Sequence, residues 1–375
     1  MAAVPRYSDR SACGCGCNGA APWPCARRLV SYSLVADEQR RDEHGVQFEL
    51  SLSSLRASNA HIPAVLFVHG ALAPEIAALC SRFGVMVAGQ GPYADRLAAL
   101  SPGRGDAMAR YPVLHKSLNF AELAAAGAQQ VLCCDLDTIF LGDVALLFDR
   151  YAAPHVVARE EAYSARSIHG ADRAFIDEPL LGRMAAHLGR AVVPPFNLGV
   201  VLYNHGVVAQ LASIMATFVD DAWRLMTGLT LHGYPNADVA GNASFPWIAD
   251  VAARASPADR QRALPFPSNN GWIVEEVAWW LALGALPGLT CADFDPRDAA
   301  QNGEVLATPR EHSTWTLCHY YSHNLARIVE WLRQAPQMPS HAARTNFLHA
   351  HPTHHGRSGL RPRSGQGLPA ATFER

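Results

Sequence analysis

The chain alternates short apolar runs with segments whose apolar residues recur at helical spacing. Strand-like runs cover residues 29–34, 65–68 and 85–88, and a helix is predicted over residues 74–83. Strands that alternate with helices in this way form parallel sheets through right-handed crossovers. The first hundred residues therefore predict an α/β unit of the kind that binds nucleotides.

The same alternation continues downstream. A helix is predicted over residues 116–126, with Gly127 as its stop, and it leads into a buried strand over residues 131–134. A β-prone segment over residues 194–204 precedes a packed helix over residues 205–226. A helix over residues 272–281 and a strand-like run over residues 314–318 complete the pattern, which predicts an α/β fold with a mostly parallel central sheet and flanking helices.

Asp135-Leu136-Asp137 directly follows the apolar run at residues 131–134. In an extended chain, residues i and i+2 point the same way, so both carboxylates can converge on one hard cation. Paired acids after a strand also arise by chance in loops. The strand-end context favours a metal site, because open α/β sheets bind ligands at the carboxyl ends of their strands.

Three later positions carry candidate chemistry. Asn197 begins a strand, where its amide either forms a turn or faces sugar hydroxyls. Glu275 and Glu276 are expected in the first turns of their helix, either as stabilisers of the helix dipole or as polar groups facing an acceptor hydroxyl. His319 ends the last strand-like run and is a candidate third metal ligand, although a lone His there is more often a hydrogen-bonded core or surface residue.

Composition narrows the class of protein. The 375 residues are 49% hydrophobic, enough for one large core or two medium ones. The net charge of −2 and the pI near 6.8 provide no basic surface for nucleic acid. The sequence lacks the pattern of a secretory signal or a transmembrane span, and most of its nine cysteines lie in apolar surroundings, so a soluble, cytoplasmic protein is expected.

The two ends of the chain differ from the rest in composition. Residues 1–27 form a Gly- and Ala-rich leader, in which Cys13, Cys15, Cys17 and Cys25 allow either a zinc site or, as we favour, a flexible segment. Residues 336–375 are rich in His, Arg and Gly and predict a disordered tail. One globular domain is therefore expected over residues 28–335.

Taken in order, VLCCDLDTIFLGDVALLFD, PPFNLGVVLYN, the Glu275-Glu276 helix and CHYYSHN resemble the motifs of metal-dependent GT-A glycosyltransferases. The likeness is greatest to the glycogenin and bacterial galactosyltransferase group, which retains anomeric configuration. The resemblance implies a GT-A fold, a nucleotide-diphosphate sugar as donor, expected to be a UDP-sugar, and an acceptor that is a saccharide, lipid, protein or small molecule. It implies Mn²⁺, or Mg²⁺ in its place, as cofactor; the imidazole ligand favours Mn²⁺.

The resemblance also implies roles for individual residues. Asp135, Asp137 and His319 would bind the metal, and the donor would contact Lys116, Asp135, Leu136 and Asp137. Asn197 would touch the transferred sugar, and Glu275 or Glu276 would line the acceptor side. Base and ribose would lie along the first strand, at Ser31, Tyr32 and Ser33.

One departure concerns the leaving group. The family has Gly and then Lys after its metal-binding His, whereas this chain has Ser322 and no Lys, so Arg327 is the candidate replacement.

Two other classes of protein are alternatives to a glycosyltransferase. A phosphatase that forms an aspartyl-phosphate usually has Thr or Val two residues past the second Asp, where this chain has Ile139. A non-enzymatic metal-binding protein would use the terminal Cys and His residues instead.

Overall fold

The computed structural model of the chain describes residues 27–89, 91, 93–100, 112–160, 178–204, 206–228, 271–301, 315–320 and 324–333. The predicted leader, apart from residue 27, and the whole predicted tail lie outside the described residues. The thiols of Cys13, Cys15, Cys17 and Cys25 and the histidines of the tail therefore stay untested. Among the described helices, none has both the length and the apolar character that a membrane crossing requires.

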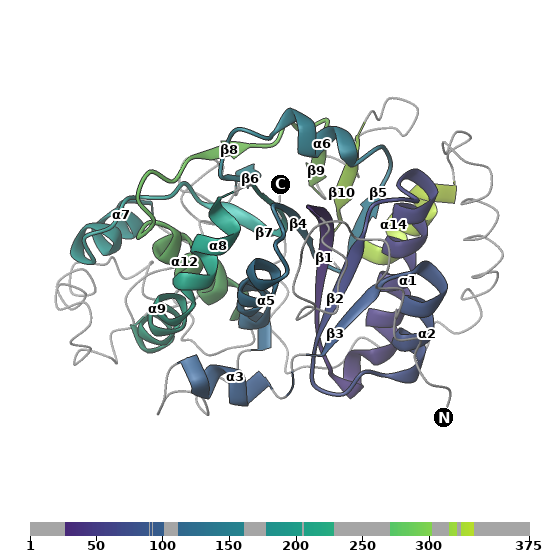
Figure 1. Cartoon of the computed structure of the whole chain (residues 1–375), viewed down its shortest axis with the longest axis horizontal. Coiled ribbons are helices and arrows are strands. Elements are labelled where there is room, and N and C mark those ends of the chain that lie inside the picture. The colour runs from purple at the N-terminus through teal and green to yellow at the C-terminus, as the bar shows by residue number, and fades with distance from the viewer. Residues whose placement is uncertain are drawn as a thin grey trace, which may run out of the picture.

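The described part of the chain contains a seven-stranded sheet in the order β3-β2-β1-β4-β7-β6-β8 (Figure 1). Its strands are β1 (Arg28–Val35), β2 (Ala64–His69), β3 (Met86–Gly89), β4 (Gln130–Cys134), β6 (Val156–Glu160), β7 (Phe196–Tyr203) and β8 (Cys291–Asp293). Four pairings are parallel, and β7 runs antiparallel to both β4 and β6. The predicted α/β class with a mostly parallel central sheet is confirmed.

A second sheet of three strands lies beside the carboxyl end of β4. It has the order β5-β10-β9 and consists of β5 (Thr138–Phe140), β9 (Ala299–Gln301) and β10 (Leu317–His319). β5 follows β4 after a turn, and β10 pairs antiparallel to it, with His319 opposite Thr138. The small sheet thereby brings His319 next to the end of β4, although the two segments are far apart in the sequence.

Helices cover both faces of the main sheet (Figure 1). On one side lie α1 (Arg41–Ser58), which follows the short 3₁₀ turn η1 (Glu38–Arg40), and α2 (Pro74–Phe83), with α14 (Leu325–Arg333) next to α1. On the other side lie α5 (Phe120–Ala125), α7 (Glu178–His187), α8 (Val207–Ser213), α9 (Met215–Gly228) and α12 (Gly271–Leu283). The remaining helices are α3 (Tyr93–Leu100), η2 (Pro112–Asn119) and α6 (Ala145–Arg150).

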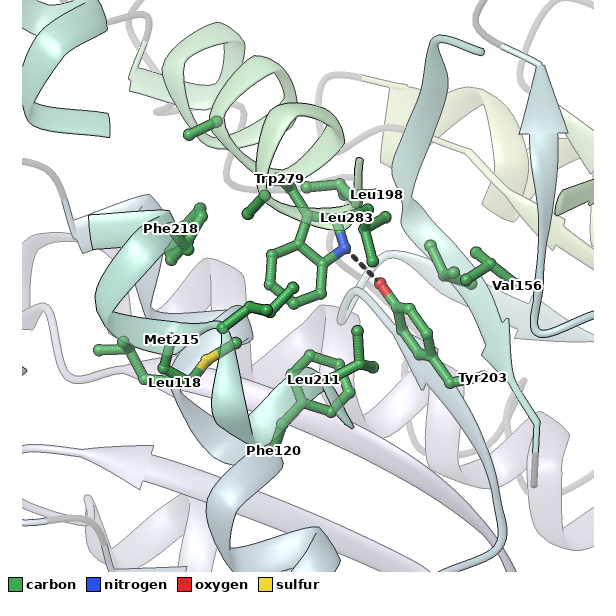
Figure 2. Packing of buried hydrophobic residues seen from close by; sticks show 14 of the residues in the cluster. Leu118, Phe120, Val156, Leu198, Tyr203, Leu211, Met215, Phe218, Trp279 and Leu283 are labelled. Carbon is green, nitrogen blue, oxygen red and sulfur yellow. Dashed lines mark hydrogen bonds between the residues drawn. The ribbon is translucent and has the colours of Figure 1, made fainter. Parts of the chain in front are cut away.

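Each face of the main sheet buries its own apolar cluster. Leu29, Val131 and Tyr203 point toward α5, α8, α9 and α12, whereas Val30, Leu132 and Leu202 point toward α1 and α2. This alternation follows from the period of two along a strand. Figure 2 shows the first cluster, in which the buried Trp279 donates its indole N–H to the Tyr203 hydroxyl at 2.8 Å.

Two predicted helices differ from the structure. Residues 116–119 belong to the 3₁₀ helix η2, and only residues 120–125 are α-helical. The packed helix expected over residues 205–226 is divided into α8 and α9 at Ile214. Ser213 Oγ donates to the Gln210 carbonyl at 2.6 Å, a side-chain bond of the type that bends helices.

Two further expectations need correction. α12 begins at Gly271, so Glu275 and Glu276 lie beyond its first turn and do not stabilise its N-terminus. The last strand is shorter than expected: β10 begins at Leu317 and includes His319 itself. Thr314, the expected start of that strand, lies outside the described residues.

Candidate metal and donor site

Asp135 and Asp137 lie in the turn that joins β4 to β5. The Asp135 N–H donates to the Gly199 carbonyl at 2.7 Å, and the Tyr320 N–H donates to the Asp137 carbonyl at 3.1 Å. Leu136, between the two acids, turns its side chain into the apolar cluster next to α1. The two carboxylates converge as predicted, but a turn brings them together and not an extended strand.

His319 faces both carboxylates. Its Nε2 lies 3.2 Å from Asp137 Oδ1 and 3.8 Å from Asp135 Oδ2. One ligand atom from each of the three residues lies within 4.8 Å of the other two. Burial disfavours the protonated imidazole, but the charges of Asp137 and Asp135 outweigh burial and raise the pKa of His319.

These three residues fit a divalent metal ion. Two carboxylates and one imidazole supply the oxygen and nitrogen ligands that Mn²⁺ accepts, and an oxygen-only shell is more typical of Mg²⁺. Asp137 and His319 are buried while Asp135 is half-buried, so a bound ion would be held by the protein on one side. The geometry thus brings together the residues predicted as metal ligands.

Lys116, on η2, lies between two acids. Its Nζ is 2.9 Å from Asp135 Oδ1 and 3.8 Å from Glu275 Oε2. Burial opposes its charge, but Asp135 and Glu275 outweigh burial and raise the pKa of Lys116. Burial raises the pKa of Glu275 to about 8, although Lys116 acts in the opposite direction. Lys116 is therefore a fixed positive charge next to the candidate metal ligands, and Glu275 holds its proton to near-neutral pH.

Asn197 and Glu276 form a separate buried pair. Asn197 Nδ2 donates to Glu276 Oε1 at 3.3 Å, and Asn197 Oδ1 accepts the Gly199 N–H at 2.8 Å. Glu276 Oε1 also lies 3.4 Å from the Leu198 N–H. The adjacent acids of α12 therefore have different partners: Glu275 contacts Lys116, and Glu276 fixes the amide of Asn197.

The first strand presents alternate residues to this region. Asn119 Nδ2 donates to Ser33 Oγ at 2.6 Å, and Ser31 bonds the thiol of Cys133. Tyr32 points to the opposite face, where it is fully buried and its hydroxyl bonds Ser51 at 3.0 Å. The Tyr32 side chain is therefore part of the core, and only its backbone remains as a candidate donor contact.

The sequence did not point to Asn119 or His115, which lie on the same 3₁₀ helix as Lys116. His115 forms an edge-to-face contact with His69 at the end of β2, with ring centroids 5.2 Å apart. Burial, together with His115 and Arg96, lowers the pKa of His69 to about 2. Gly199, in the middle of the predicted strand, is a position that the sequence could have singled out. A glycine inside a strand often marks a place where another part of the protein or a ligand approaches the backbone closely.

Arg327, the candidate replacement for the diphosphate-binding Lys, lies on α14 with an exposed side chain. α14 packs through Ile328 and Trp331 against a cluster that includes Tyr320, the residue that follows His319. Arg327 is thus placed on an element near the small sheet, and its contact with a ligand stays a prediction.

No family model matches the chain, and a search of curated proteins found no match. Among solved structures, it is similar to galactosyltransferase LgtC in complex with donor and acceptor sugar analogs, with a TM-score of 0.42 and 12% identity over 83% of this chain and 97% of that one. Mouse xyloside xylosyltransferase 1 gives a TM-score of 0.41 and 11% identity over 78% and 97%. Glycosyltransferase GlyE of Streptococcus pneumoniae TIGR4 gives 0.43 and 12% over 86% and 64%.

These three proteins are glycosyltransferases, the class of enzyme whose motifs the sequence resembles. Their TM-scores lie below 0.5 and their identities near one residue in eight, so the similarity carries no inference about substrate or residue roles.

Proposed function

We propose that this protein is a metal-dependent glycosyltransferase that moves a sugar from a nucleoside-diphosphate sugar to an acceptor. The observation that carries the proposal is the convergence of Asp135, Asp137 and His319, whose ligand atoms lie within 4.8 Å of one another, with Lys116 bonded to Asp135. Two fixed carboxylates and an imidazole suit a divalent cation, and the half-buried ammonium group of Lys116 beside them suits the diphosphate that such a cation would bind.

The reaction builds negative charge on the departing diphosphate and positive character on the sugar. A divalent ion held by Asp135, Asp137 and His319 would neutralise part of the charge on the diphosphate. Lys116 adds a second positive charge at the same place, and its pKa keeps it protonated at any physiological pH. We propose Mn²⁺ as the natural ion because of the imidazole ligand.

The other residues position substrates in this proposal. Asn197 would contact the transferred sugar with an amide whose orientation is fixed by Gly199 and Glu276. Glu275 would line the sugar or acceptor side, Ser31 and Ser33 with the backbone of Tyr32 would lie along base and ribose, and Arg327 would meet the leaving diphosphate. Holding the acceptor hydroxyl close to the anomeric carbon, on the face that gives retention, is mainly a problem of orientation.

We propose a UDP-sugar as donor and leave the acceptor as a saccharide, lipid, protein or small molecule. Transfer of a hexose, retention of configuration and a cytoplasmic location remain predictions from the sequence motifs and composition. The phosphatase alternative is not favoured, because Ile139 stands where such enzymes usually have Thr or Val, and because both acids face the imidazole of His319.

Thermal-shift screening of nucleotide sugars, with and without Mn²⁺, tests the proposal. A nucleoside-diphosphate sugar should raise the Tm of the wild-type protein in Mn²⁺ and lose most of that effect in EDTA, because a ligand that binds only the folded state stabilises it. The Asp137→Asn variant should respond weakly in both conditions. A stabilisation that is unchanged by chelator and by the substitution would reject the proposal.

A matched control separates the two possible sources of metal binding. Deletion of residues 1–26 and 334–375 should leave the Mn²⁺-dependent shift in place, because the proposed ligands lie on β10 and in the turn before β5. Loss of metal affinity on removing the ends alone would favour the non-enzymatic metal-binding protein.

A further inference from the structure

Gly199 lies in the middle of β7, a strand whose eight residues are all buried. Glycine is often required where the backbone adopts a positive φ, but Gly199 is not among the glycines in that conformation. The backbone at this position would accept any residue. The reason for a glycine must therefore be sought in the space around its α-carbon.

That space is filled by the imidazole of His319. A Cβ added to Gly199 would stand 2.6 Å from His319 Nε2 and closer still to Cε1 and Nδ1. Non-bonded carbon atoms prefer separations of about 3.5–4.0 Å, so even a methyl group does not fit unless the imidazole or the strand moves. Nε2 is the atom that faces Asp137 and Asp135.

The backbone of Gly199 contacts two other residues of the site. Its carbonyl accepts the Asp135 N–H at 2.7 Å, and its N–H donates to Asn197 Oδ1 at 2.8 Å. These bonds fix the main chain of one metal ligand and the amide of the residue proposed to contact the sugar. Gly199 is thus in contact with His319, Asp135 and Asn197, which come from three different segments of the chain.

From these contacts we propose that Gly199 is a positioning residue for the metal site: its missing side chain lets the imidazole of His319 approach β7 and turn Nε2 toward the two carboxylates. The inference rests on the proposed function in that it takes the three residues to be metal ligands. Groups that orient metal ligands typically change metal affinity by about 10- to 100-fold when they are altered. We expect an effect of that size from a single methyl group at this position.

A double-mutant cycle on Mn²⁺ affinity tests the proposal, with isothermal titration of the full-length protein as the measurement. Gly199→Ala should weaken Mn²⁺ binding by about 10- to 100-fold. In the His319→Ala background, the same substitution should change the remaining affinity by less than about threefold, because the imidazole that it displaces is absent. Equal losses in both backgrounds, or no loss in either, would overturn the proposal.

Gly182→Ala is the matched control. Gly182 lies within α7, has no positive φ, and a Cβ placed there would meet no atom within 4 Å. This variant should bind Mn²⁺ as the wild type does. A loss at Gly182 equal to the loss at Gly199 would show that the effect is not specific to the strand beside His319, and would also overturn the proposal.

The melting temperature in EDTA is a second measurement that needs no metal. It remains informative if the Gly199→Ala protein is too unstable for a reliable Mn²⁺ titration. Gly199→Ala should lower the Tm of the wild type, but should leave the Tm of His319→Ala nearly unchanged. The same experiments separate this inference from the proposed function. If Asp137→Asn abolishes Mn²⁺ binding while Gly199→Ala does not weaken it, only the positioning role fails. If the wild type binds no Mn²⁺ but the Tm values still show coupling, the proposed function fails and the contact stands.

Discussion

At the scale of single residues, the site brings acidic and basic side chains together in buried and half-buried positions. Lys116 contacts Asp135 and Glu275, and His319 contacts Asp135 and Asp137. Buried charges are costly unless they are paired, so an arrangement of this kind is better explained by ligand binding than by stability. Two consequences for titration follow.

The first prediction concerns Glu275. Burial raises the pKa of Glu275 from 4.5 to about 8. Between these two pH values, the native state keeps a proton on Glu275 that the unfolded chain has lost, so the stability that this proton contributes is lost as the pH rises from 4.5 to about 8. The free energy of unfolding of the metal-free wild type should therefore fall as the pH rises from about 4.5 to 8. The free energy of unfolding of Glu275→Gln should fall less over the same range. Urea unfolding in EDTA at several pH values measures this.

Glu38→Gln is the control, because the Glu38 side chain is 93% exposed. Its stability should follow the wild-type dependence on pH. Parallel curves for the wild type and Glu275→Gln would contradict the assignment of a proton to Glu275.

The second prediction concerns His319, whose pKa is raised by Asp137 and Asp135 against the effect of burial. Without metal, the protonated imidazole stabilises the fold below pH 6.5, and this contribution is lost as the pH rises through the raised pKa. The proton must leave before Nε2 binds a cation, so Mn²⁺ affinity should weaken by up to about tenfold for each pH unit below that pKa. Titrations at pH 5.5, 6.5 and 7.5 check this, and a constant affinity would refute it.

At the scale of elements, the apolar pattern predicted the strands β1, β2, β3, β4, β7 and β10 and the helices α2, α5, α8, α9 and α12. Buried strands are recognisable because they are continuous apolar runs bounded by turn residues. The pattern did not predict that residues 116–119 are 3₁₀, since side chains there bond to residues far along the chain: Lys116 bonds Asp135 in the turn after β4, and Asn119 bonds Ser33 on β1. Such long-range bonds leave no local signal. Helix α1 was likewise not predicted: it buries several polar residues among its apolar ones, such as Gln47 and Ser51.

The third prediction concerns Asn59, which follows α1 and fixes the loop after β5. Its side-chain N–H donates to the Gly142 carbonyl at 2.9 Å, and its oxygen accepts the Val144 N–H at 2.7 Å. Asn59→Ala leaves the buried Val144 N–H and the half-buried Gly142 carbonyl without these bonds, and should lower the free energy of unfolding by about 1–3 kcal/mol. Denaturant titration measures the loss.

The comparison for Asn59 is Asp149→Ala, which breaks the exposed ion pair with Arg28 at 2.7 Å. Exposed pairs contribute less than about 1 kcal/mol. An equal loss in the two variants would mean that the bonds of Asn59 do not hold the loop.

At the scale of the whole molecule, the class of fold and the candidate metal ligands could be predicted from the sequence, but the way in which distant segments assemble the site could not. The motif at Asp135 and Asp137 indicated the carboxyl end of a strand, which is where the structure places it. His319 lies on β10 of the small sheet, next to the end of β4, and its imidazole contacts Gly199. Both placements depend on packing between segments that are distant in the sequence. The different partners of Glu275 and Glu276 also became clear only from the register of α12 against η2 and β7.

The fourth prediction tests the apolar cluster on the side of the main sheet that α12 covers. Trp279 is fully buried, stacks on Phe120 with ring centroids 5.3 Å apart, and donates to Tyr203 (Figure 2). Trp279→Ala should cost about 3–5 kcal/mol of stability by leaving a cavity. Leu146→Ala, at a side chain that is 55% exposed, should cost less than about 0.5 kcal/mol. Equal costs in denaturant titration would contradict this description of the core.

The central claim is that Asp135, Asp137 and His319 hold a divalent ion that in turn binds a nucleoside diphosphate. Isothermal titration of UDP into the wild-type protein, in saturating Mn²⁺ and again in EDTA, is the most direct measurement. We expect UDP binding in Mn²⁺, at least tenfold weaker binding in EDTA, and comparable weakening in Asp137→Asn with Mn²⁺ present, a difference of at least about 1.4 kcal/mol. UDP binding of the same affinity in EDTA and in Asp137→Asn would contradict the claim.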